Sequence, residues 1–181
     1  MTLKNTVLIG LWLMFGLLAR LIPHAPNLSP FTSLIILIGC QLSRRTAVTI
    51  TLLCLFFSDL FIAKIFNYSV FGSWSLFTYT GFAFIACAST LLQKKRSILR
   101  VIAVAASSVL GYWVWTNFGT WVATIDYPHT LAGLGMCFMA GLPFLANSVQ
   151  STLFFVPVFF AGLTLVEHYM KSEKQVVKQS T

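Results

Sequence analysis

Long apolar runs, separated by short polar or proline-rich breaks, make up nearly all of this chain. A run of about 20 apolar residues is long enough to cross the ~30 Å hydrocarbon layer of a bilayer as a helix. Only 9% of the residues are charged, against about 25% in soluble domains, so the chain could not cover the surface of a soluble fold. The sequence therefore predicts an all-α integral membrane protein with little of it outside the bilayer.

The breaks divide the chain into about six transmembrane helices. Three prolines between residues 23 and 30 end the first helix, because proline removes a backbone N–H and restricts the residue before it. The last apolar stretch would reach about 60 Å as one helix, so we expect Pro143 to divide it. The expected helices are 3–22, 31–42, 46–66, 74–92, 98–122, a short 131–142 and 144–169. Residues 1–170 would form the transmembrane domain, and 171–181 a disordered polar tail in the cytoplasm.

The basic residues predict the orientation. All Lys and Arg except Arg20 and Lys64 lie near alternate ends of the expected helices, and the other loops carry almost none. Because Lys and Arg are enriched in cytoplasmic loops, we expect a multi-pass protein of the bacterial cytoplasmic membrane with both termini in the cytoplasm. The clustering beside apolar runs also argues against a nucleic-acid partner, despite a net charge of +8. The clusters are Lys4; Arg44 and Arg45; Lys94, Lys95, Arg96 and Arg100; and Lys171, Lys174 and Lys178.

One carboxylate lies inside an expected span. Asp59 has Leu and Phe as sequence neighbours, and an ionisable group within the bilayer costs roughly 2.5–3.5 kcal/mol on insertion scales. It therefore needs a partner, either Arg20 at the outer end of the first helix or Lys64. Two interpretations stay open: a structural ion pair, or a polar pocket that opens to the outside and includes His24 and Asn27 of the first outer loop. We expect Arg20 and Asp59 to approach each other.

The fifth expected helix carries a stripe of aromatic and polar residues. Trp113, Asn117 and Trp121 are four residues apart and therefore share one helical face towards the outer end. An aromatic belt at the membrane interface is the alternative, especially for Trp121, but a belt does not need Asn117. Aromatic walls with a few placed polar groups are typical of small-molecule sites, so we expect this face to point into the protein. Additional candidates, for which core packing is as good an explanation, are Trp74, Tyr79 and Asn147.

Catalytic motifs are absent from the sequence. It has no HExxH, GxSxG or Walker A pattern, its three His are isolated, and its four acidic residues give acid–base chemistry little to work with. The four cysteines lie in apolar runs, where we expect them to be small buried hydrophobes. We therefore expect no enzyme activity, no cofactor and no metal site.

Three motifs resemble those of a bacterial membrane-protein family. They read Arg-Leu-Ile-Pro-His-Ala-Pro-Asn at 20–27, Ser-Asp-Leu at 58–60 and Asn-Phe-Gly-Thr-Trp at 117–121. The family is similar in general type to the substrate-binding S components of energy-coupling-factor (ECF) vitamin transporters. The resemblance implies a six-helix bundle that binds a vitamin-like micronutrient on its outer side. It also implies an ECF transmembrane scaffold with ATPases as a partner. A solitary protein is the alternative, because the first helix carries Gly10 and Gly16 but no Ala-x-x-x-Ala.

Together these features predict small-molecule binding and uptake. The ligand, a vitamin or another micronutrient, would enter from outside, its anionic group would meet Arg20, and the tryptophans would stack on a ring. The alternative is a non-transport membrane scaffold, such as an envelope or cell-shape assembly protein, which would need no polar outer pocket. The expected ligand-binding residues are Arg20, His24, Asn27, Asp59, Trp113, Asn117 and Trp121.

The orientation can be tested with a reporter enzyme that is active only in the periplasm. Fused after Lys178, it should be inactive, because the basic clusters place the end of the chain in the cytoplasm. Fused into the 123–130 loop, the same reporter should be active. An active fusion after Lys178 would reverse the orientation.

Overall fold

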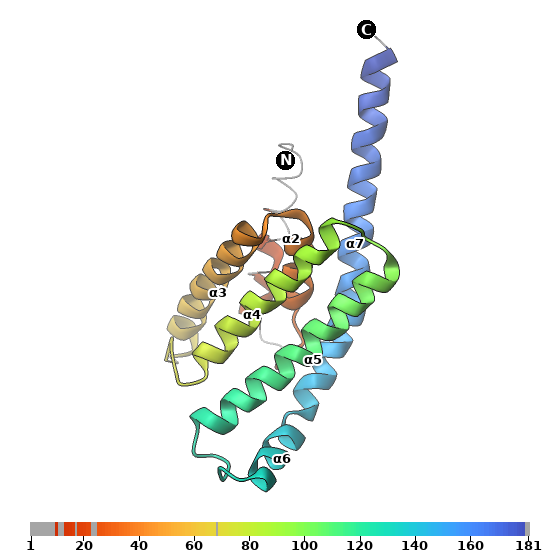
Figure 1. Ribbon diagram of the computed structural model, residues 1–181. Helices are drawn as coiled ribbons and strands as arrows, with labels where there is room; N and C mark the ends of the chain where they lie inside the picture. Colours follow the sequence, from red (N-terminus) through yellow and green to blue (C-terminus); the bar gives the residue numbers. More distant parts are fainter. Residues whose placement is uncertain (1–9, 11–12, 17, 23–24, 68, 180–181) are drawn as a thin grey trace.

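The computed structural model describes residues 10, 13–16, 18–22, 25–67 and 69–179, and the regular elements in these ranges are helices. Among the described residues, four segments are long and apolar enough to cross a membrane, and two further apolar helices, α2 and α6, are shorter. The predicted all-α membrane fold is therefore confirmed at this level (Figure 1). The helices are α2 (Phe31–Gln41), α3 (Arg44–Phe66), α4 (Ser75–Ser89), a 3-10 turn η1 (Thr90–Gln93), α5 (Ile98–Ala123), α6 (Leu131–Ala140) and α7 (Leu142–Gln179).

With α4 and η1 taken together, the expected boundaries lie within two residues of these bounds at every helix end except the last. Ser43 and Ser97 explain two of the starts, because each side-chain oxygen accepts a hydrogen bond from a first-turn N–H and so caps its helix. The expected first helix falls partly outside the described residues, and its described segments 13–16 and 18–21 are helical. This first helical segment contacts three helices, because Phe15 meets Phe159 of α7 edge to face, a Cβ on Gly16 would collide with Leu34 of α2, and Arg20 bonds Asp59 of α3.

The expectation that the polar tail is disordered was wrong for residues 171–179. Residues 171–179 continue α7 as a helix, and Figure 1 shows α7 projecting beyond the rest of the bundle. Lys, Glu and Gln are good helix formers, and no Gly or Pro interrupts this stretch. The polar composition of residues 171–179 argues against a position inside the bilayer, but it is compatible with a helix.

The short helix α2 lies at the centre of the bundle. Nine of its eleven residues are buried, and it contacts α3, α4, α5 and α7. At 1.5 Å per residue it is only about 16 Å long, which is about half the hydrocarbon thickness. Space at one end of α2 must therefore be filled by something other than helix.

The carboxyl end of α2 is closed by neighbouring groups. The Gln93 amide donates hydrogen bonds to the carbonyl oxygens of Gly39 and Leu42, which satisfies acceptors that a helix end leaves without partners. Gly39 also lets α2 approach α4, because a Cβ there would lie 2.8 Å from the Ala86 carbonyl oxygen and 2.5 Å from the Ser89 Cβ. The open space is thus confined to the amino end of α2.

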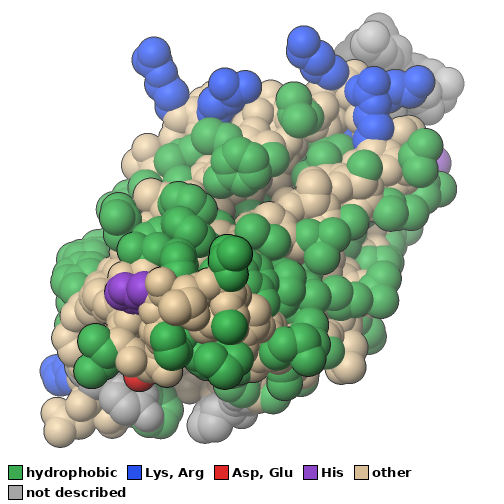
Figure 2. All heavy atoms as spheres, turned by 60° about the horizontal axis from the view of Figure 1, so that its bottom comes forward, with side chains coloured by type: hydrophobic (Ala, Val, Ile, Leu, Met, Phe, Trp, Pro, Cys, Tyr) green, Lys and Arg blue, Asp and Glu red, His purple; other side chains and the backbone are tan. Residues whose placement is uncertain are grey.

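The basic side chains of the loops gather at one end of the bundle. Figure 2 shows most of the Lys and Arg side chains there, and Figure 1 places the α2–α3 turn, the η1–α5 turn and the end of α7 at the same end. Arg44, Arg45, Lys94, Lys95 and Arg100 are all exposed. We call this the basic end, and the other, where α2 begins, the outer end.

The α2–α4 contact can be tested by replacing Gly39 with Ala. The added methyl group meets α4 backbone, so we expect a loss of about 1–3 kcal/mol in the free energy of unfolding. Gly111→Ala is the matched control, because a Cβ on this exposed helical residue meets no atom within 4 Å. Thermal unfolding in detergent measures both, and equal stabilities would contradict the packing.

Candidate functional site

Two charged residues meet near the outer end, as expected. Arg20 Nη2 donates a hydrogen bond to Asp59 Oδ1 at 2.8 Å, and Tyr79 Oη donates to Asp59 Oδ2 at 2.9 Å. The side chains of Arg20 and Asp59 are only 18% and 11% exposed. Lys64, the other partner considered, is exposed. The predicted approach of Arg20 and Asp59 is therefore confirmed, and it ties the first helical segment to α3 and α4.

The Arg20 guanidinium keeps unused donor capacity. Its carbon lies 4.8 Å from the centre of the Phe31 ring, a cation–π contact that holds the planar group against the start of α2. Nη1 is buried, and among the described residues it has no hydrogen-bond partner. A buried donor without an acceptor costs about 1–3 kcal/mol. The described residues therefore leave one donor of the Arg20 guanidinium without an acceptor.

A cavity of about 240 Å³ lies beside Arg20. It occupies the space that the short α2 leaves at the outer end, and residues of α3, α4, α5 and α7 complete its wall. Pro30, the N-cap residue of α2, makes no side-chain capping hydrogen bond, but Ser29 Oγ accepts one from the Phe31 N–H at 3.3 Å. The positive end of the α2 dipole lies beside the charge of Arg20. The lining residues are Arg20, Asn27, Ser29, Phe31, Thr32, Ile62, Thr78, Phe82, Tyr112 and Ser148. We call this the Arg20 cavity.

A second cavity of about 170 Å³ adjoins it at the outer end and shares Asn27 with it. Asn27 has a left-handed backbone, with φ of 63°, a conformation that Asn tolerates better than most residues. Two residues of α7 hold this loop, because Asn147 Nδ2 donates to the Pro26 carbonyl and Ser151 Oγ donates to the Ser29 carbonyl. The cavity also meets Trp113, Thr116, Asn117, Thr120, Tyr127, Cys137, Ala140, Gly141 and Phe144.

The stripe on α5 is only partly as expected. Trp113 and Asn117 are half-buried and line the second cavity, so their inward orientation is confirmed. Trp113 Nε1 donates to the Gly141 carbonyl at 2.9 Å, and Asn117 Nδ2 donates to the Trp113 carbonyl at 2.7 Å. The Asn117 oxygen lies against Gly141, where a Cβ would collide with it. One of the two Asn117 N–H donors is therefore satisfied by its own helix.

Trp121 lines neither cavity. Its Nε1 donates to the Pro128 carbonyl at 2.9 Å, and its ring meets His129 edge to face at 5.5 Å. It therefore anchors the loop between α5 and α6 rather than forming a cavity wall. His24, also expected at the site, lies outside the described residues.

The chain matches the sequence model of a protein family over residues 1–175, and that family is described as a family of unknown function (DUF6580). The chain belongs to this family. No curated protein and no solved structure matches it. Nothing in these comparisons supports the expected resemblance to ECF S components, which stays a proposal.

Several cavity residues of this DUF6580 chain escaped the sequence reasoning. Thr78, Tyr112 and Ser148 each adjoin a residue that was a candidate, namely Tyr79, Trp113 and Asn147. Adjacent residues on a helix point about 100° apart. The prediction considered only the helical face of each candidate, and so it missed the next residue in the sequence, which also reaches the cavity. In the described residues, no group of three or more His, Cys, Asp or Glu could hold a metal ion.

The contribution of the charged pair to stability can be measured by substitution. Asp59→Ala should lower the free energy of unfolding by about 3–5 kcal/mol, because it leaves the Arg20 charge buried without its partner. Tyr79→Phe removes one hydrogen bond and should cost only about 1 kcal/mol. The double variant Arg20→Met with Asp59→Leu should recover most of the Asp59→Ala loss. Unfolding in a denaturing detergent measures all three, and equal losses for Asp59→Ala and Tyr79→Phe would contradict this account.

Proposed function

We propose that this protein binds a small anionic molecule in the Arg20 cavity and takes part in its uptake across the cytoplasmic membrane of a bacterium. The single observation that carries the proposal is the buried Arg20 Nη1, which lacks a partner among the described residues beside a cavity of about 240 Å³. A carboxylate or phosphate oxygen at this nitrogen would complete the hydrogen bonding of the guanidinium.

The amino end of α2 supports an anion at the same place. Phe31 and Thr32, the first two residues of α2, both line the cavity. The Phe31 N–H already donates to Ser29 Oγ, and the other first-turn N–H groups point out of the helix end and favour negative charge. Asp59 already balances the single positive charge of Arg20, so the helix end supplies the additional attraction that a second anion needs.

Size and lining support a small ligand with a flat part. The Arg20 cavity is slightly smaller than the roughly 300–1,000 Å³ of sites for drug-sized ligands. Thr32, Thr78 and Ser148 supply hydroxyl groups, and the rings of Phe31 and Phe82 supply apolar walls. A vitamin-like micronutrient with a carboxylate or phosphate group combines these features, and the adjoining second cavity offers room for a neutral extension.

The proposed topology has six crossings in an S-component-like bundle with both termini in the cytoplasm. Four of these crossings would be the long apolar helices. The first helical segment would be the fifth, and α2 together with the proline-rich loop before it would be the sixth. The exposed basic residues at one end support a cytoplasmic position for that end. Since the sequence has no Walker A motif, a separate energising module, such as an ECF scaffold with ATPases, would drive uptake.

Ligand binding can be tested with purified protein and a panel of vitamin-like carboxylates, phosphates and neutral amide analogues. An acidic member should raise the unfolding temperature, corresponding to about 2.7 kcal/mol at a hundredfold excess over Kd, and its amide analogue should not. Arg20→Lys should lower the affinity at least tenfold, because Lys keeps the charge but loses the planar fork.

Lys64→Gln is the matched control, because it removes an exposed positive charge from the same end of α3. Its affinity should equal that of the native protein. If no acidic compound stabilises the protein, or if Lys64→Gln weakens binding as much as Arg20→Lys, the Arg20 cavity is not an anion site. The membrane-scaffold alternative would then be favoured.

A further inference from the structure

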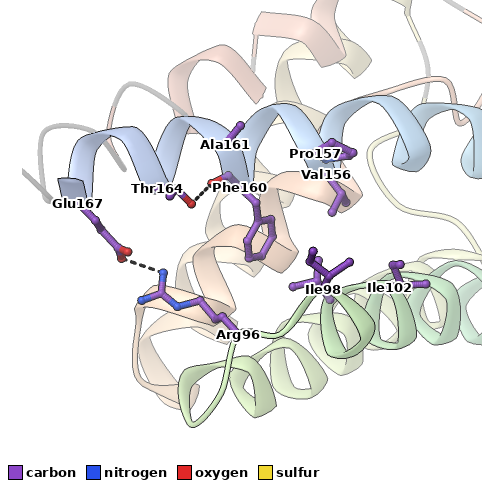
Figure 3. A pocket seen from close by; sticks show the side chains of 10 residues that line it. Arg96, Ile98, Ile102, Val156, Pro157, Phe160, Ala161, Thr164 and Glu167 are labelled. Atoms are coloured by element: carbon purple, nitrogen blue, oxygen red, sulfur yellow. Dashed lines mark hydrogen bonds and ion pairs between the residues drawn. The ribbon is translucent and has the colours of Figure 1, made fainter. Parts of the chain in front are cut away.

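A groove opens between α5 and α7 at the basic end of the bundle, away from the Arg20 cavity. Its volume is about 570 Å³, and Figure 3 shows Phe160 of α7 and Ile98 of α5 pointing into the space between the two helices. A second hollow of about 270 Å³ continues it along the same pair of helices, since both share Ile102, Val156 and Pro157. The groove is lined by Arg96, Ile98, Val101, Ile102, Val156, Pro157, Phe160, Ala161, Thr164 and Glu167.

The walls of the groove are apolar and open to the surroundings of the bundle. Ile98 is 81% exposed and Ile102 is 58% exposed. Ala161, a small residue, leaves room on the α7 side. In a protein that crosses a membrane, exposed apolar side chains at this level contact hydrocarbon. An acyl chain therefore fits the walls better than a polar molecule does.

The mouth of the groove is charged. Arg96 Nη1 donates to Glu167 Oε1 at 2.8 Å across it, and the two side chains remain 37% and 34% exposed (Figure 3). Lys94, Lys95 and Arg100, which are near Arg96 in the sequence, are exposed at the same end of the bundle. Among the residues that line the groove, Glu167 is the acidic one. Arg96 also has N–H groups beyond the one that Glu167 accepts. The mouth therefore complements a negatively charged headgroup.

The length of the groove matches one leaflet. Val156 and Glu167 are eleven positions apart on α7, which corresponds to about 16 Å of helix, and half of a ~30 Å hydrocarbon core is about 15 Å. We propose that this groove binds one anionic phospholipid of the leaflet at the basic end, with its phosphate at Arg96 and one acyl chain along Ile98, Phe160 and Val156. Glu167 competes with the phosphate for Arg96 and so limits the affinity.

Native mass spectrometry of the detergent-purified full chain tests the proposal. Phosphatidylglycerol and phosphatidylcholine with identical acyl chains are titrated separately, and the fraction of protein carrying one lipid is measured. We expect phosphatidylglycerol to bind at least threefold more tightly. Arg96→Gln should lower phosphatidylglycerol affinity to that of phosphatidylcholine, whereas Glu167→Gln should raise it, because the competing carboxylate is gone. These opposite effects distinguish lipid binding from a merely structural ion pair, whose loss would act in one direction.

Two further variants separate this groove from general attraction to a basic surface. Arg45→Gln removes an exposed charge from the basic end but not from the groove, and it should leave both affinities unchanged. Ala161→Phe fills the groove and should lower the affinity for both lipids. Equal affinity of the native protein for the two lipids would overturn the proposal. So would a loss in Arg45→Gln as large as that in Arg96→Gln, or an unchanged affinity in Glu167→Gln.

Discussion

A buried helix that is too short to cross a membrane determines the arrangement of this bundle. The eleven residues of α2 are almost all buried and apolar, so neighbouring helices must surround them. Backbone groups within a bilayer need internal hydrogen-bond partners. At the basic end Gln93 supplies them to the last carbonyls of α2. At the outer end the proline-rich loop provides no side-chain cap from Pro30, and the space there becomes the Arg20 cavity.

Arg20, Asp59 and Tyr79 connect this central helix to its surroundings. The three side chains come from three different parts of the chain, and Arg20 also packs on Phe31 of α2. A buried ion pair is not by itself a stabilising device, because desolvation can exceed the attraction between the charges, and apolar replacements are often as stable. The pair therefore contributes something that apolar packing could not, namely a fixed guanidinium at the edge of a cavity.

Local physical rules made much of the fold predictable. Apolar runs and prolines located the helices of the bundle, and the high cost of an unpaired intramembrane carboxylate identified Arg20 as a partner for Asp59. Asn117 shows the limit of such reasoning. Its side chain lines the second cavity as expected, but its amide donates to a carbonyl of its own helix, and sequence spacing does not distinguish this bond from a ligand contact. The orientation of the Trp121 ring likewise depends on its hydrogen bond to the Pro128 carbonyl. The position of that carbonyl is set by the loop, whose geometry helical spacing does not predict.

Cavities and grooves formed between helices were not predictable from the sequence, unlike the Arg20–Asp59 contact. The α5–α7 groove depends on how two helices lie relative to each other, and neither helix shows it alone. The groove and the Arg20 cavity nevertheless share α7, whose first turns hold the Pro26–Ser29 loop through Asn147 and Ser151. Pro157 lies between these contacts and Glu167, and it lacks the N–H that would join its turn to the preceding one. One helix thus holds the loop beside the polar cavity at one end and lines the apolar groove at the other, and the turn that Pro157 weakens belongs to the stretch that lines the groove.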